Sequence, residues 1–159
     1  MYLVLKLIHV VAIIAFLGNI STGLYWKAIA DRTRDVHVIT HTLAGIIRSD
    51  RWFTIPSIVV IVLSGVATAL VGHIPLLGTG WILWSIVLFV ASGAAFGPVA
   101  RAQRDMLDLA REAAAGELDW GRYRELTRKW ELWGTIALGM PLLAVVLMVL
   151  KPALPSLHQ

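Results

Sequence analysis

Four long apolar runs alternate with polar connections along the chain. They lie at residues 2–25, 53–72, 81–100 and 132–150, and each is close to the ~20 residues that a helix needs to cross the hydrocarbon core of a bilayer. No linker or shift in composition divides the chain, so we expect residues 1–159 to form a single membrane domain. The pattern predicts an all-α integral membrane protein built as a four-transmembrane-helix bundle.

Charged side chains are concentrated in two of the three connections. All 10 acidic residues and 12 of the 14 basic residues lie at 26–52 and 100–132, whereas the connection at 73–80 carries no formal charge. Lys and Arg are enriched on the cytoplasmic side of membrane proteins. We therefore expect a multi-pass membrane protein with both charged connections in the cytoplasm and both termini extracytoplasmic.

The connection between the third and fourth runs keeps a helical pattern on both sides of Gly116, a natural helix stop. Apolar residues recur before it at helical spacing, at Val99, Ala102, Met106, Leu109 and Ala113. Asp119 is placed to cap a second helix, and one face of that helix carries Trp120, Tyr123, Leu126 and Trp130. This pattern predicts a long cytoplasmic helical hairpin between spans three and four.

The first charged connection contains an amphipathic stretch. Its apolar stripe consists of Val36, Ile39, Leu43, Ile46 and Ile47. Such a stripe beside charged residues predicts a helix that lies on the inner membrane surface. His37 and His41 lie four residues apart on the opposite face, but no third ligand is aligned with them, so we interpret them as solvated.

Composition supports the membrane class and excludes several others. Of 159 residues, 58% are hydrophobic and 15% charged, and the mean hydropathy is +0.75; a soluble domain has about 25% charged residues. The chain has no cysteine, which excludes disulfides and thiol chemistry. The net charge of +4 reports topology rather than nucleic-acid binding. The first run lacks a basic leader and a convincing cleavage site, so we interpret it as a retained span.

Small residues within the spans predict close helix packing. Gly93 and Gly97 are four residues apart in the third run, a spacing that lets two helices approach closely in lipid. We expect these glycines to face a neighbouring helix.

One histidine lies inside the first run, where an ionisable group is costly and marks function or a buried partner. His9 is at about the depth of Ser64, Thr68 and Ser85 of the other spans. Three interpretations are open. The imidazole is a hydrogen-bonded peg to one of these hydroxyls, an axial ligand of a b-type haem, or a proton-relay or copper residue.

For a haem, the helix face around His9 is suitable because apolar and small residues such as Phe16 flank it. His73 is the one histidine on the correct side that could supply a second axial ligand; otherwise the site is five-coordinate. Lys6 lies one turn from His9 and extends to the headgroups or pairs with a haem propionate.

Two long stretches carry a family resemblance. The segment "YLVLKLIHVVAIIAFLGNISTGLYWK", followed by "ADRTRD" and "RSDRWFTIPS", resembles a bacterial integral-membrane family known as domain of unknown function 2269. More distantly, "LKLIHV" is similar to the first span of copper-resistance protein D and of the J-type protoporphyrinogen oxidase. In that oxidase group a first-span histidine and a third-span lysine are implicated in haem binding. The resemblance implies His9 as a haem ligand; the counterpart of the lysine is Ser85, which departs from the oxidase pattern.

Two functions follow from these observations. The first is a small membrane protein that binds haem b through His9 and acts in redox chemistry or electron transfer. The alternative is a cofactor-free structural or assembly subunit of a larger membrane complex. The expected partners are the lipid bilayer and either a membrane protein or a second copy of the chain, not a nucleic acid.

Overall fold

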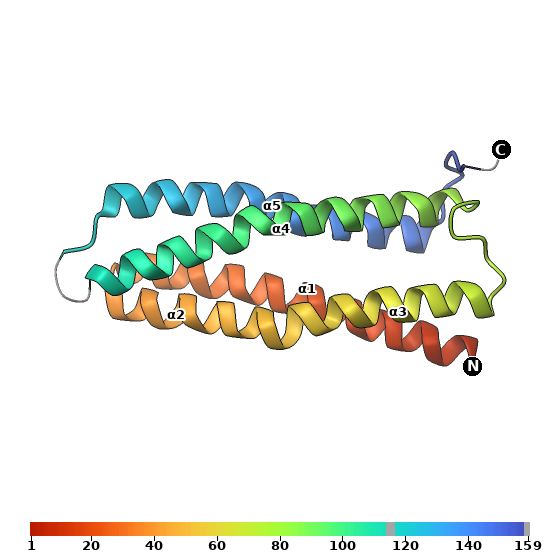
Figure 1. Cartoon of the computed structure of the whole chain (residues 1–159), viewed down its shortest axis with the longest axis horizontal. Coiled ribbons are helices and arrows are strands. Elements are labelled where there is room, and N and C mark those ends of the chain that lie inside the picture. Colours follow the sequence, from red (N-terminus) through yellow and green to blue (C-terminus); the bar gives the residue numbers. More distant parts are fainter. Residues whose placement is uncertain (114–116, 158–159) are drawn as a thin grey trace.

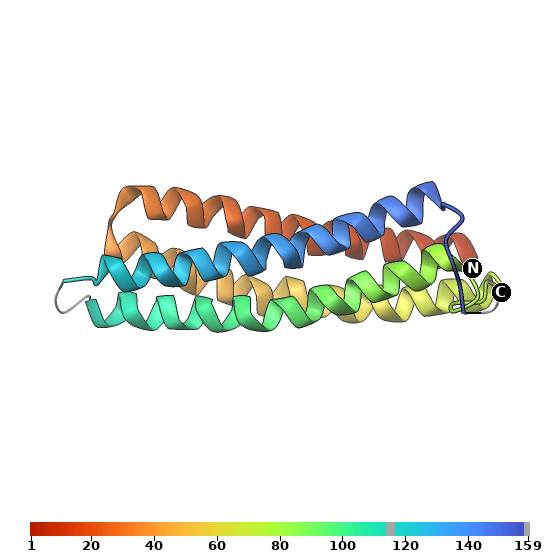
Figure 2. The ribbon, with the colours of Figure 1, turned by 90° about the horizontal axis from the view of Figure 1, so that it is seen from above.

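The computed structural model describes residues 1–113 and 117–157, and all regular structure in these ranges is helical. The elements are α1 (Tyr2–Thr33), α2 (Val36–Ser49), η1 (Asp50–Thr54), α3 (Ile55–Val71), α4 (Gly80–Glu112) and α5 (Trp120–Leu150). Four helical segments are long and apolar enough to cross a membrane. They lie side by side in one elongated bundle (Figures 1 and 2), which confirms the all-α four-helix prediction.

The second of these rods is one continuous helical segment, Val36–Val71, that contains α2, the π-helical turn η1 and α3. α2 therefore extends along the bundle axis (Figure 1), and the prediction of a helix on the membrane surface is wrong. Its stripe residues Ile39, Leu43 and Ile46 are buried against other helices. The physical reason is length. At 1.5 Å per residue the 32-residue α1 is about 48 Å long, well beyond a hydrocarbon core of about 30 Å. The end of α1 that projects beyond the hydrocarbon core therefore needs a neighbouring helix to cover its apolar side chains.

The charged half of the bundle, residues 26–52 and 100–132, has the larger core. Its buried apolar residues include Met106, Ala110, Leu118, Tyr123, Leu126 and Trp130. The helices expected on either side of this connection are present, since α4 extends to Glu112 and α5 begins at Trp120. The Asp119 carboxylate caps α5 by accepting the Arg122 N–H at 3.0 Å. The predicted stop at Gly116 lies outside the described residues.

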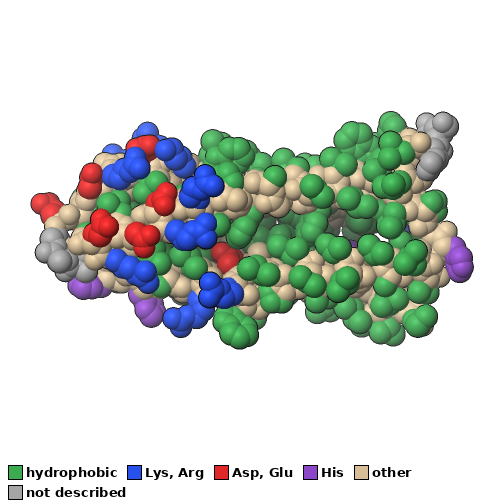
Figure 3. Space-filling model, viewed as in Figure 1, with side chains coloured by type: hydrophobic (Ala, Val, Ile, Leu, Met, Phe, Trp, Pro, Cys, Tyr) green, Lys and Arg blue, Asp and Glu red, His purple; other side chains and the backbone are tan. Residues whose placement is uncertain are grey.

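In the apolar half the bundle separates into two pairs of helices. α1 packs with α3 and α4 packs with α5, and among the described residues no Cα of α3 lies within 8 Å of α4 or α5. Phe16 of α1 meets Phe89 of α4 with ring centroids 5.9 Å apart. Figure 3 shows the surface hollowed between the two layers in this half. We call this space the hollow.

The expected role of the third-span glycines is not observed. A Cβ built at Gly93 or Gly97 would have no heavy atom within 4 Å, and both residues are exposed. They therefore face outward from the α4–α5 pair instead of packing against a helix of the same chain.

The surface divides into two zones, with charges over one half and apolar side chains over the other (Figure 3). Exposed aromatic residues mark the boundary between them, at Tyr25, Trp26, Trp52, Phe53 and Trp133. Trp and Tyr are enriched at the level of lipid headgroups. This ring of aromatic residues places one membrane boundary at the junction of the two halves.

Candidate functional site

The His9 side chain lies between α1 and α3 and is half-buried. Its Nδ1 is 2.9 Å from the Ile61 carbonyl oxygen and 3.2 Å from the Ser64 Oγ. A carbonyl oxygen only accepts hydrogen bonds, so the Nδ1 of a neutral His9 ring carries the proton and donates it to Ile61. The Nε2 then holds a lone pair, and no described residue hydrogen-bonds to it.

A glycine makes room for this ring. A Cβ at Gly65 would lie 2.9 Å from the His9 Cε1, closer than such contacts allow. The ring also faces the inside of the bundle, because Phe16 and Lys27, seven and eighteen residues later on the same helix face, are both buried. The position of His9 on the inward face of α1 and its contacts with α3 therefore hold the imidazole in one orientation.

The other candidate residues of the sequence are spread over the apolar half. His73 is exposed in the turn after α3, with a left-handed φ of 53°. Lys6 is exposed on α1, and the buried Ser85 donates to the Trp81 carbonyl at 2.7 Å, within α4. In the described part of the chain, no hydrogen bond joins any of these three to His9. Phe16, a further candidate residue, lies on the same inward face of α1 as His9 and packs against Phe89.

Ser85 has a second contact that explains its burial. Its Oγ is 3.3 Å from the Ala144 carbonyl oxygen of α5, and Ser92 makes a similar contact of 2.6 Å to the Ala137 carbonyl oxygen. These serines lie between α4 and α5. Ser85 therefore belongs to the α4–α5 pair, on the other side of the hollow from the His9 contacts.

A second polar cluster, which the sequence did not reveal, lies at the junction of the two halves. The Asn19 Nδ2 donates to the Thr54 Oγ1 at 2.9 Å and to the Asp50 Oδ1 at 3.2 Å, and the Thr54 Oγ1 donates to the same Asp50 oxygen at 2.9 Å. The buried Gln103 side chain of α4 also lies close to Asp50. No Lys, Arg or His nitrogen of the described residues lies within 4.0 Å of this carboxylate. The one signal was Asn19, an amide within an apolar run.

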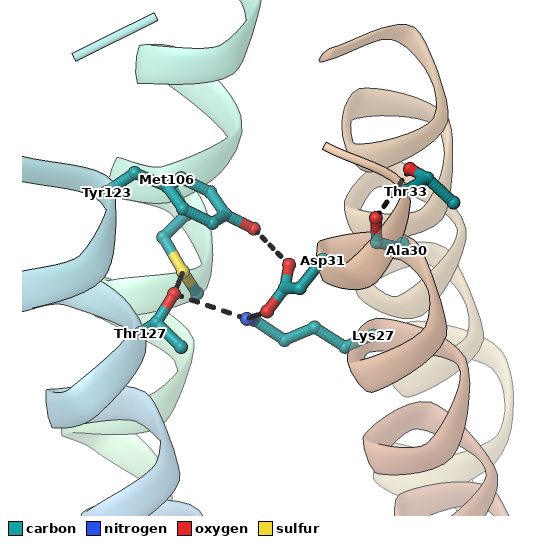
Figure 4. Close-up of polar contacts among 7 residues, drawn as sticks. All are labelled: Lys27, Ala30, Asp31, Thr33, Met106, Tyr123 and Thr127. Atoms are coloured by element: carbon teal, nitrogen blue, oxygen red, sulfur yellow. Dashed lines mark hydrogen bonds and ion pairs between the residues drawn. The ribbon is translucent and has the colours of Figure 1, made fainter. Parts of the chain in front are cut away.

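The third cluster lies deep in the charged half (Figure 4) and centres on a buried lysine. Lys27 is 1% exposed, and its Nζ lies 2.5 Å from the Asp31 Oδ2 and 3.3 Å from the Thr127 Oγ1. The Tyr123 hydroxyl donates to the other Asp31 oxygen at 2.7 Å. Sequence analysis did not identify this cluster, because a Lys and an Asp four residues apart in a charged segment are typical of a solvated helix face.

Aromatic rings complete the surroundings of Lys27. Its Nζ is 5.4 Å from the centroid of Tyr123 and 5.0 Å from that of Trp130, within the range of cation–π attraction. Burial and the Asp31 carboxylate raise the pKa of Tyr123, so its phenol stays protonated and keeps donating to Asp31. The Thr127 hydroxyl also donates to the Met106 Sδ of α4 at 3.5 Å, so one polar cluster joins α1, α4 and α5.

Comparison with known proteins identifies the family. Residues 3–152 match a family described as "Predicted integral membrane protein (DUF2269)". The chain belongs to this family. No curated protein and no solved structure matches the chain, so the similarity to copper-resistance protein D and the J-type oxidase stays a prediction from the first span.

Without a bound cofactor, the side chains of this DUF2269 protein can support only a limited range of chemistry. Among residues 1–113 and 117–157, no group of three or more His, Cys, Asp or Glu is close enough to hold a metal ion. Asp31 is already paired with Lys27, and Asp50 is surrounded by neutral donors. The half-buried imidazole of His9, by contrast, has no hydrogen bond to its Nε2 from any described residue.

Proposed function

We propose that this DUF2269 protein binds a b-type haem through His9 and acts in redox chemistry or electron transfer. The supporting observation is the orientation of the His9 ring. Its Nδ1 donates to the Ile61 backbone carbonyl, and its Nε2 has no hydrogen-bond partner among the described residues. Histidines that ligate metals typically donate their other ring N–H to a carbonyl or carboxylate, which fixes the tautomer and the ring orientation.

The surroundings of His9 suit an apolar macrocycle. The hollow lies between the two helix pairs, and the buried Ala12 and Phe16 lie beside His9 on the inward part of α1. Helical bundles commonly bind cofactors through inward-facing side chains. When bound, the haem would supply one-electron chemistry, while Ile61 and Gly65 hold and accommodate its ligand.

We favour one protein ligand to the iron. The His9 ring packs on Gly65. His73 lies eight residues after Gly65, which corresponds to roughly 12 Å along a helix axis. Lys6 lies one turn before His9 and is exposed, where its ammonium could meet a propionate. Under this proposal the sixth position is open for a small molecule.

The proposed orientation places both termini outside the bacterial inner membrane and the charged half in the cytoplasm. The support is the concentration of Lys and Arg in residues 26–52 and 100–132. His9 then lies in the outer leaflet, and the chemistry takes place near the outer face.

A cofactor-free structural or assembly subunit is the second candidate. It is favoured by the contacts of the His9 ring with α3, which are those of a polar peg between two helices. The exposed Gly93 and Gly97 also leave the α4 surface open to a membrane-protein partner or a second copy of the chain.

The visible spectrum of the purified protein separates the two candidates. We expect the wild-type protein in mild detergent to show a Soret band, directly or after titration with hemin, and His9→Ala to lose it. His37→Ala is the matched control, since His37 is an exposed histidine of α2, and it should keep the band. His73→Ala should keep it too if the iron has one protein ligand.

Two results would contradict the haem proposal. A wild-type protein that stays colourless with added hemin, at normal yield and fold, favours the structural subunit. Equal loss of the Soret band in His9→Ala and His37→Ala would indicate non-specific hemin binding.

A further inference from the structure

A small cavity lies between α4 and α5 at the junction of the charged and apolar halves. Its volume is about 210 Å³. The lining residues on which the argument depends are Pro98, Arg101, Asp105, Arg122, Lys129 and Trp133. None of them belongs to the three polar clusters described above, so the cavity is a separate feature of the molecule.

The depth of this cavity corresponds to lipid headgroups. Pro98 belongs to the apolar run at 81–100, and Arg101 follows this run directly. Lys129 precedes the apolar run at 132–150, and Trp133 is the second residue of that run. Trp133 also belongs to the ring of exposed aromatic residues at the membrane boundary. The cavity is therefore cationic on one side and apolar on the other.

The lining has an excess of positive charge. Three cations and one carboxylate give a net charge of +2. Glu125 offsets part of this, because it accepts hydrogen bonds from Arg122 at 3.1 Å and Lys129 at 2.8 Å. These side chains are about half exposed, and exposed ion pairs contribute little energy. Arg101 has no carboxylate oxygen of the described residues within 4.0 Å.

We propose that this cavity binds the phosphate group of an anionic phospholipid. Arg101 and Lys129 face the phosphate, and the acyl chains leave along Pro98 and Trp133 into the bilayer. Basic pockets between membrane helices at the headgroup level are suited to anionic lipids, and a guanidinium matches the geometry of phosphate oxygens. A soluble phosphate would use the same cations and gain nothing from the apolar side.

The test is a titration of the detergent-solubilised full chain with fluorescent phosphatidylglycerol, with unlabelled lipids as competitors. We expect phosphatidylglycerol to compete and phosphatidylcholine and inorganic phosphate to compete poorly. Arg101→Gln with Lys129→Gln should weaken binding roughly 30-fold, from about fivefold per basic residue near a headgroup. Arg104→Gln with Arg128→Gln is the matched control. It removes the same charge from exposed neighbours that do not line the cavity, and should change binding by about threefold at most.

Each other outcome overturns the proposal. Equal weakening in the two double variants would mean general surface electrostatics, and effective competition by inorganic phosphate would mean a soluble anion. Competition by phosphatidylcholine equal to that of phosphatidylglycerol would mean no headgroup selectivity. If the double variant does not fold, Arg101→Lys keeps the charge and should still weaken binding several-fold through loss of the guanidinium fork; unchanged binding contradicts the site.

Discussion

At the scale of residues, the most unusual side chain is Lys27, a fully buried ammonium in a chain of few charges. Asp31 compensates its charge, and Tyr123, Thr127 and Trp130 surround it. A buried ion pair adds little net stability compared with apolar residues, but removal of one partner leaves an uncompensated charge. Lys27 should therefore be far more sensitive to its surroundings than any lysine on the surface.

Asp31→Asn removes the anion and leaves the buried ammonium. We expect the free energy of unfolding to fall by about 3–5 kcal/mol, measured by denaturant or thermal unfolding in detergent. Asp108→Asn is the matched control, since this carboxylate is 67% exposed and lies 3.8 Å from Arg111; its effect should be about 0.5 kcal/mol or less. Adding Lys27→Met to Asp31→Asn should recover part of the loss. Equal effects of the two single variants would contradict the buried pair.

At the scale of elements, the decisive feature is the continuity of α2, η1 and α3. The π-helical turn carries Asp50 and Thr54, whose side chains meet Asn19 of α1. Thr54 is fully buried. Short π-helical segments within longer helices are frequent at functional sites. Here the segment orients two polar side chains toward α1 at the membrane boundary.

Thr54→Val tests this cluster at nearly constant volume. The variant loses the hydroxyl that accepts from Asn19 and donates to Asp50, so we expect a loss of about 1–3 kcal/mol in the free energy of unfolding. Thr135→Val should change it little, because Thr135 is exposed and its hydroxyl donates only to the Glu131 carbonyl of its own helix. A neutral Thr54→Val would mean that the cluster is not a stabilising contact between α1 and η1.

The sequence predicted the type and number of long helices but not the position of α2. Its stripe of Ile39, Leu43 and Ile46 fits a lipid surface and a protein neighbour equally well, because both are apolar. The helical periodicity of residues 99–113 predicted the extension of α4, since charged and apolar positions alternate there with a clear period. Within an apolar run no such contrast exists, which is why the outward direction of Gly93 and Gly97 was not foreseen.

The candidate site was predicted in part for a similar reason. His9 stands out as an ionisable group among apolar residues, so composition alone marks it. Its partners Ile61 and Gly65 could not be named, because one contributes a backbone carbonyl and the other only the absence of a side chain. The Lys27–Asp31 pair was missed because burial depends on α5, nearly a hundred residues later.

At the scale of the whole molecule, the charged half and the apolar half are distinct in surface and in packing. The four rods share one core in the charged half and separate into two pairs in the apolar half. The proposed orientation assigns the charged half to the cytoplasm. Because the chain has no cysteine, single cysteines report this orientation without background.

Glu117→Cys and Leu77→Cys place a thiol at opposite ends of the bundle, each at an exposed position. We expect a membrane-impermeant maleimide to label Leu77→Cys on intact spheroplasts, and Glu117→Cys only after the membrane is opened. The reverse pattern would contradict the proposed orientation. Equal labelling of both before opening would indicate mixed insertion.

The separation of the helix pairs has a mechanical consequence. Beyond the core that all four rods share, each pair extends for roughly 30 Å, as for some 20 residues of helix. A tilt of about 5° at the shared core moves the far end by roughly 3 Å, a simple leverage that a bundle packed along its full length lacks. We expect such a tilt to change the width of the opening beside His9, where lateral pressure from the surrounding acyl chains acts with the longest lever.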